Sequence, residues 1–104
     1  MARKHLLPAL LFEMLGTGII ATAVNIYSYN FTSDILIYYA LTYFCAMLIA
    51  TPLSGGHLNP AITVGVWIAA TGASKAEFVT MALMILAQFF GTLFGVTAAR
   101  SMRF

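Results

Sequence analysis

Midway along the chain the sequence reads Ser54-Gly-Gly-His-Leu-Asn-Pro-Ala-Ile-Thr-Val-Gly65. Glycine is a poor helix former, so the two glycines after Ser54 do not continue a helix comfortably. Asparagine is among the preferred N-cap residues and proline is favoured at the first helical position, an order that Asn59 and Pro60 follow. An apolar stretch then reaches Ala70. We therefore expect a short helix that starts at Asn59 and runs for about eleven residues.

This short helix has about half the length that a membrane span requires. At 1.5 Å per residue it is about 16 Å long, and the hydrocarbon core of a bilayer is about 30 Å thick. A re-entrant half-helix fits these dimensions best, with the N–H groups and the positive dipole end at Asn59 near the midplane. The non-helical backbone of residues 53–58 must then be buried in protein or line a water-filled cavity. The alternative is a short helix in a long loop at the membrane surface.

The rest of the chain has the composition of a membrane protein. Of its 104 residues, 62% are hydrophobic and only 8% are charged. Residues 6–29, 35–52 and 76–99 form apolar segments that are each about long enough to cross a bilayer. Asp34 suits the N-cap or first turn of the second segment, and Ser74 suits the N-cap of the third. We predict an all-α membrane protein with three transmembrane helices and one re-entrant half-helix, forming a single domain over residues 1–104.

Several other classes of function find no support. The net charge of +2 is the balance of five basic and three acidic residues, and the basic residues are scattered and form no stripe for nucleic acid. Cys45 is the single cysteine, so it forms no disulfide within the chain, and we expect it to be buried. His57 has only His5 as a fellow histidine, which argues against a metal site. Because we find no nucleophile–base pair and no cofactor motif, we expect neither an enzyme nor a bound cofactor.

The central motif resembles that of a known family. The run from Ser54 to Gly65 resembles the first Asn-Pro-Ala loop of the major intrinsic protein family, the aquaporins and glycerol facilitators. Glu13-Met-Leu-Gly-Thr17 resembles the family's glutamate pattern in the first span, and Ala87-Gln88-Phe-Phe-Gly91 resembles its glutamine pattern in the third. The resemblance covers essentially the whole chain, and the loop is more similar to the water-selective branch than to the glycerol branch.

The resemblance implies half of a channel. The family's pore is built from two halves inserted in opposite orientations, whose half-helices each bring an Asn-Pro-Ala to the midplane. The sequence matches the first half only; it lacks the second Asn-Pro-Ala, the arginine that follows it, and spans four to six. We expect half of a channel for passive transport of water or small neutral solutes, which needs a second half from another polypeptide, from the rest of the same chain, or from an inverted copy. The alternative is a non-conducting accessory subunit of a larger membrane complex, an expectation that the methionine start and the basic end also fit.

The resemblance also assigns roles to individual residues. It implies that the backbone carbonyls of Gly55, Gly56 and His57 act as acceptor steps for permeating molecules, while the His57 imidazole braces the loop. Tyr39, twenty residues before Asn59, falls near the aromatic residue of the family's filter. Tyr38 is adjacent, and both tyrosines suit an aromatic belt or helix packing equally well. The implied pore-lining set is Gly55, Gly56, His57, Asn59, Pro60, Ala61, Ile62 and Tyr39.

Two polar side chains inside the spans are expected to support the loop. An ionisable residue within a span is costly and usually paired or functional, which applies to Glu13. The resemblance implies that Glu13 accepts hydrogen bonds from the loop backbone and that Gln88 braces the same loop. The alternatives are a carboxylate near the interface and an ordinary interhelical hydrogen bond. For the glycines we expect close helix packing, at Gly91 and Gly95 in the third span and at Gly65 in the half-helix.

The basic residues bear on orientation and partners. Three of them fall on the N-terminal side of the membrane and two on the other side, which slightly favours a cytoplasmic or matrix N-terminus. These residues are Arg3, Lys4 and Lys75, and Arg100 and Arg103. We expect an integral membrane protein in contact with lipid and with a second half or other membrane subunits, as an oligomer or part of a complex.

Overall fold

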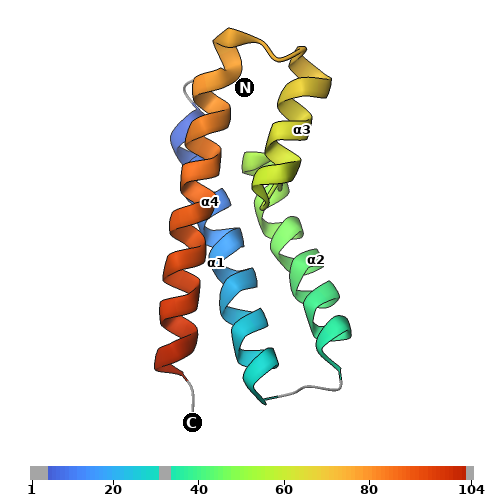
Figure 1. Ribbon diagram of the computed structural model, residues 1–104, viewed down its shortest axis with the longest axis vertical. Helices are drawn as coiled ribbons and strands as arrows, with labels where there is room; N and C mark the ends of the chain where they lie inside the picture. The colour runs from blue at the N-terminus through green and yellow to red at the C-terminus, as the bar shows by residue number, and fades with distance from the viewer. Residues whose placement is uncertain (1–4, 31–33, 103–104) are drawn as a thin grey trace.

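The computed structural model describes residues 5–30 and 34–102. Arg3, Lys4 and Arg103, on which the predicted orientation partly rests, lie outside the described residues. The described chain is all-helical and contains no strand. Figure 1 shows its four helices, which are α1 (Leu6–Asn30), α2 (Ile35–Ser54), α3 (Pro60–Thr71) and α4 (Lys75–Ser101).

The predicted fold class is confirmed. Helices α1, α2 and α4 are long and apolar enough to cross a membrane, and α3, with 12 residues, is a shorter apolar helix. The start of α1 and the α3–α4 turn lie at one end of the molecule, and the ends of α1 and α4 lie at the other (Figure 1). Many large apolar side chains on the outside of α2, α3 and α4 are exposed, as a surface in lipid requires.

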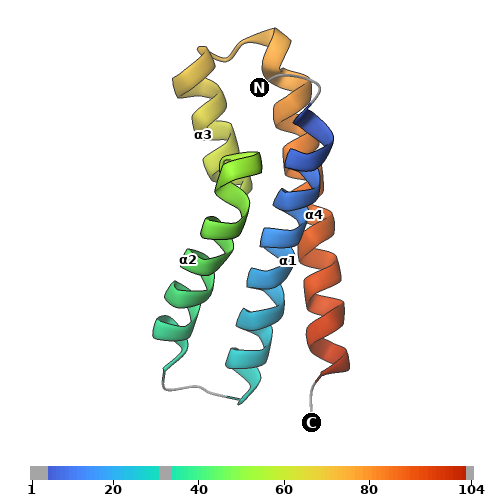
Figure 2. The same ribbon diagram turned by 180° about the vertical axis from the view of Figure 1, so that it is seen from behind.

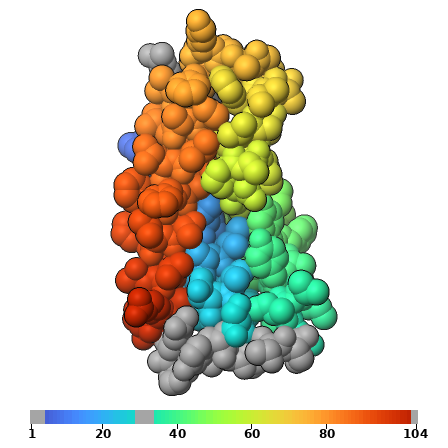
Figure 3. Space-filling model, viewed as in Figure 1, coloured from blue at the N-terminus to red at the C-terminus, as the bar shows by residue number. Residues whose placement is uncertain are grey.

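Helix α1 is the centre of the arrangement. It packs against α4 on one side and α2 on the other, as the reverse view shows (Figure 2). Helix α3 follows α2 and lies beside the N-terminal half of α4, so that it begins about half way along the molecule (Figure 1). Below the start of α3, α1 is visible between α4 and α2 (Figure 3). The loop between α2 and α3 therefore lies at mid-height.

The α1–α4 interface depends on small residues. A Cβ atom at Gly95 would lie 2.5 Å from the carbonyl oxygen of Gly18 and 2.7 Å from the Cβ of Ala21. A Cβ at Gly91 would overlap the backbone of Met14. Close approach also places the Thr22 hydroxyl 2.7 Å from the Gly18 carbonyl oxygen and 3.1 Å from that of Gly95, and the two oxygens share its one proton. The two helices are thus held backbone to backbone.

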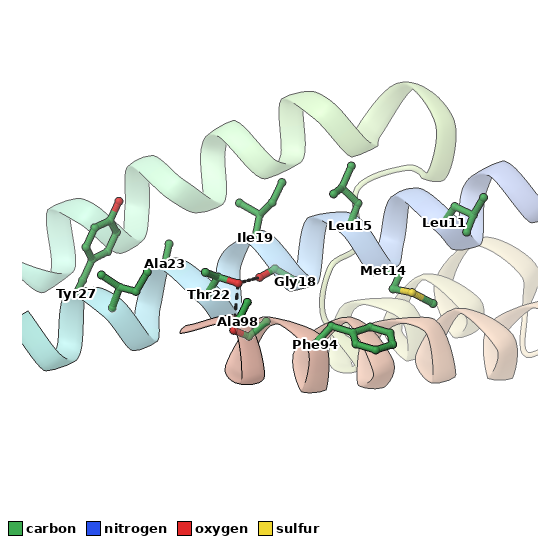
Figure 4. A pocket seen from close by; sticks show the side chains of 12 residues that line it. Leu11, Met14, Leu15, Gly18, Ile19, Thr22, Ala23, Tyr27, Phe94 and Ala98 are labelled. Carbon is green, nitrogen blue, oxygen red and sulfur yellow. Dashed lines mark hydrogen bonds between the residues drawn. The ribbon is translucent and has the colours of Figure 1, made fainter. Parts of the chain in front are cut away.

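A groove of about 670 Å³ follows the same pair of helices. Figure 4 shows Leu11, Ile19 and Phe94 among the side chains that line it. The Thr22 hydroxyl is already bonded between α1 and α4, and most of the other lining groups are apolar. This surface suits lipid rather than a polar solute.

Gly65 does not share this packing. It is exposed, and a Cβ built there would meet nothing within 4 Å among the described residues. The buried position of α3 is Thr63, so the face that carries Gly65 points away from the rest of the described chain. The close packing expected at Gly65 is therefore not made within this part of the chain.

Two further local expectations need correction. Helix α2 continues through Leu53 and Ser54, which we expected to be non-helical. The last turn brings Ser54 Oγ within 3.0 Å of the Ala50 carbonyl oxygen, and the helix ends where Gly55 adopts a φ of 87°. Cys45, expected to be buried, is exposed because α2 is covered along one side only.

The ends of the other helices follow the predicted capping chemistry. Asn59 Oδ1 accepts a hydrogen bond from the N–H of Ala61 at 2.8 Å, and Pro60 is the first residue of α3. Gly72, with a φ of 65°, ends α3. Ser74 caps α4 through its side chain. Asp34 stands at the N-cap of α2 but makes no side-chain cap.

Candidate functional site

The carboxylate of Glu13 lies completely buried behind the α2–α3 loop. Its Oε1 accepts hydrogen bonds from the Leu58 N–H at 2.9 Å and from Gln88 Nε2 at 2.8 Å. Its Oε2 accepts one from the Ser54 hydroxyl at 2.6 Å. The three partners come from the end of α2, from the loop and from α4. One side chain of α1 thus joins the end of α2, the loop and α4.

Ser54 carries this network into the loop. Besides donating to Glu13, its oxygen accepts a hydrogen bond from the Gly56 N–H at 3.2 Å. The loop turns sharply here, because Gly55 and Gly56 both have positive φ values, 87° and 66°. Sequence reasoning quoted Ser54 only as part of the motif. The signal for its role is a hydroxyl placed directly before two glycines.

Thr63 connects the half-helix to the same network. It is 2% exposed, and its Oγ1 accepts a hydrogen bond from Gln88 Nε2 at 2.8 Å. The same Oγ1 lies 3.1 Å from His57 Nδ1 and 3.3 Å from the Asn59 carbonyl oxygen. A hydroxyl has one proton, so Thr63 donates either to the Asn59 carbonyl or to an unprotonated His57 Nδ1; in the other tautomer of His57 the Nδ1–H donates to Thr63. Sequence reasoning missed Thr63, although a threonine four residues after the N-cap of an apolar helix was a usable signal.

Leu58 is held in a conformation that leucine rarely adopts. Its φ is 55°, in the left-handed region, where a non-glycine residue costs on the order of 1–3 kcal/mol. Two anchors offset this cost: the N–H bonds Glu13, and the buried side chain packs with Ala46 and Ala50. Gly16 of α1 makes room, since a Cβ there would overlap the Leu58 side chain. The loop conformation is therefore fixed by α1 and α2 together.

The N-terminal end of α3 is left open. Asn59, Pro60, Ala61 and Ile62 are all exposed. Since Asn59 Oδ1 is used by the cap, the amide nitrogen is the part that remains, and it has no acceptor within the described ranges. The positive end of the helix dipole lies at the same place. This end presents hydrogen-bond donors to whatever faces it.

The carbonyl side of the loop is differently placed. Gly55 is exposed, Gly56 is buried and His57 is half-buried. The His57 carbonyl oxygen accepts a hydrogen bond from the Tyr43 hydroxyl at 3.3 Å. Sequence reasoning missed Tyr43, although it lies one helical turn beyond Tyr39 on the same face.

Tyr39 makes no hydrogen bond to the described loop, but its side chain lies near the loop. The Tyr39 ring is 6.1 Å from that of Tyr43, centroid to centroid. Tyr39 and Leu58 line a hollow of about 240 Å³ together with residues of α1 and α4. A second hollow, of about 470 Å³, lies on the other side of the loop and is lined by His57, Thr63 and neighbours from α2, α3 and α4. In the ranges that the structure covers, no three His, Cys, Asp or Glu side chains gather at either place.

Replacing Gln88 with leucine should cost only about 1–2 kcal/mol of unfolding free energy. The change removes the donor to Glu13 and Thr63, but both retain other partners. It also removes Gln88 Oε1, a buried oxygen that has no partner within the described chain. Unfolding of purified native and Gln88→Leu protein in detergent tests this. A loss above about 4 kcal/mol, the scale of a broken buried charge pair, would contradict the shared network.

Comparison with known proteins gives one match. A family model described as major intrinsic protein matches residues 4–103. A search of curated proteins and a search of solved structures each found no match.

Proposed function

Because the chain belongs to the major intrinsic protein family, whose members are channels rather than enzymes, we propose that it forms half of a channel for water or small neutral solutes. The observation that carries the proposal is the Glu13 network. It binds Ser54 and Leu58 and so holds the loop directly before Asn59. A non-helical loop supported this firmly inside a membrane protein suits a path for solutes.

The proposed path uses donors and acceptors of the same loop. The Asn59 amide and the N-terminus of α3 offer donors, while Gly55 and its neighbours offer carbonyl acceptors. A water molecule that accepts from Asn59 turns its own hydrogens away from it, which orients single-file water. The positive helix end disfavours cations at the same point. Transport in this proposal is passive, so that each solute moves down its own concentration gradient.

A second half is part of the proposal. Asn59 and its neighbours are exposed, and unsatisfied polar groups in lipid cost several kcal/mol each. A second half-helix that faces Asn59 covers them and closes the path. The sequence contains one Asn-Pro-Ala, followed by Ile62, so the arginine expected at the filter must come from that second half. The second half belongs to the same polypeptide or to another one in the complex. For the orientation in the membrane, we favour an N-terminus on the cytoplasmic or matrix side.

Combining the chain with the C-terminal half of a full-length family member should produce fast water flow. Vesicles with both halves are compared with vesicles containing either half, by stopped-flow shrinkage. Asn59→Ser is the matched variant, because serine keeps the N-cap but removes the amide donors. We expect it to lower water permeability about fivefold, the effect of one ordinary hydrogen bond. If both halves bind each other yet conduct no water, the chain is better described as an accessory subunit.

A further inference from the structure

We propose that Tyr43 determines solute size in this half-channel: its hydroxyl occupies the His57 carbonyl and its ring narrows the path, so that water passes and glycerol-sized solutes are held back. The inference rests on the proposed function. It concerns a residue of α2 that takes no part in the Glu13 network.

The contact joins two separate elements. The Tyr43 hydroxyl donates to the carbonyl oxygen of His57 at 3.3 Å, across fourteen residues of sequence. This carbonyl belongs to the loop that directly precedes Asn59. A carbonyl oxygen has two lone pairs, and the tyrosine occupies one of them. In the proposed path, a molecule that passes His57 therefore meets the Tyr43 phenol oxygen as well as the His57 carbonyl, which has one lone pair left.

The Tyr43 ring is fixed in this position. It packs against the buried cluster of Ala46, Ala50 and Leu58, so the small alanines of α2 leave room for the ring beside the loop. Tyr39 lies one helical turn earlier, with ring centroids 6.1 Å apart and planes tilted by 31°. The two rings lie on one face of α2, one helical turn apart. A ring held in place discriminates solutes by size better than a mobile side chain, because it cannot yield to a larger solute.

Chemistry reinforces the effect of size. The proton of the Tyr43 hydroxyl is committed to His57, so the hydroxyl offers a passing solute only acceptor lone pairs. Water can use these with one hydrogen and keep its second for the next water molecule. A polyol has several hydroxyl groups that need hydrogen-bond partners at the same time. It therefore loses more hydrogen-bond energy than water when Tyr43 occupies an acceptor of the loop and the path is narrow. Removing the hydroxyl frees the carbonyl and adds the room of one oxygen atom.

The test measures water and glycerol permeability of vesicles that contain the chain together with the C-terminal half of a full-length family member. Three proteins are compared: native, Tyr43→Phe and Tyr38→Phe. Tyr38→Phe is the matched control, because it removes the same hydroxyl from the same helix. The Tyr38 ring lies beside that of Tyr27 in α1, with the ring centroids 4.8 Å apart. We expect Tyr43→Phe to raise the glycerol-to-water permeability ratio about fivefold, the effect of one ordinary hydrogen bond, and Tyr38→Phe to leave it unchanged.

The possible failures are distinguishable. If native protein conducts water and Tyr43→Phe has the native ratio, the size-selection role is wrong while the half-channel stands. If native protein conducts nothing, the half-channel itself is overturned, and the inference falls with it.

The contact is checked separately by infrared spectroscopy of the full chain with ¹³C-carbonyl histidine in a His5→Gln background, so that His57 alone is labelled. Its carbonyl band should move to higher frequency in Tyr43→Phe, and an unmoved band would contradict the hydrogen bond.

Discussion

Glu13→Leu is expected to destabilise the folded chain by about 3–5 kcal/mol, and Glu13→Gln by much less. Leucine removes the acceptor of three buried donors at once, which come from Ser54, Leu58 and Gln88. Leu58 then also loses the hydrogen bond that holds its unfavourable φ of 55°. Loss of the carboxylate should therefore free the whole α2–α3 loop and not only break one hydrogen bond.

Glutamine can reproduce most of the network. Its amide oxygen can take the place of Oε1 and accept from Leu58 and Gln88. Its amide nitrogen then faces the Ser54 oxygen, which already accepts from the Gly56 N–H and can accept again. Unfolding in detergent gives the stability of each variant, and hydrogen exchange at the Leu58 amide reports the loop directly. Equal tolerance of leucine and glutamine would count against a supporting role for Glu13.

Gly91→Ala is expected to cost about 1–3 kcal/mol despite adding a single methyl group. The new Cβ would collide with the Thr17 hydroxyl and with the backbone of Met14, which cannot rotate away as a long side chain could. Helices α1 and α4 would have to separate, which weakens the Thr22 hydrogen bond to Gly95 as well. Stability in detergent measures the loss.

Gly65→Ala provides the matched control on α3. A Cβ at Gly65 meets nothing within 4 Å in the described chain, and alanine favours a helix over glycine by roughly 0.5–1 kcal/mol. We therefore expect a neutral or slightly stabilising change in the isolated chain. If Gly91→Ala behaves in the same way, α1 and α4 are not held backbone to backbone. If Gly65→Ala instead weakens binding of the second half, the exposed face of α3 is where that half packs.

Local chemistry made the helices predictable from the sequence. Their lengths follow from apolar runs, and the ends of α3 follow from Asn59, Pro60 and Gly72, which act within one or two turns. The end of α2 was harder to place. Whether the chain leaves the helix at Leu53 or at Gly55 depends on the Ser54 hydroxyl bonds, which the sequence does not display.

The site was predictable only in part, because most of its contacts join distant elements. A costly carboxylate in a span and the family resemblance singled out Glu13 and Gln88. Thr63 and Tyr43 gain their positions from packing between helices, and neither belongs to a pattern that marks it alone. The positive φ of Leu58 is imposed by its two anchors, not by its own preference.

Exposure was the least predictable property. Cys45 and Gly65 have sequence surroundings typical of packed positions, yet both lie on uncovered surfaces. Burial of an apolar residue in a membrane protein depends on which neighbour covers it, since lipid is as good a solvent as a protein core.

The most direct test of the half-channel is the water permeability of vesicles in which the purified chain is the sole protein. A Cys45→Ala background removes the single cysteine, so that mercury or oxidation has no thiol to modify. Stopped-flow shrinkage should be close to that of protein-free vesicles, because no second half-helix faces Asn59 and no filter arginine is present. Fast flow with weak temperature dependence would contradict the need for a second half from another polypeptide or from the rest of the same chain, and would show that the chain conducts water by itself.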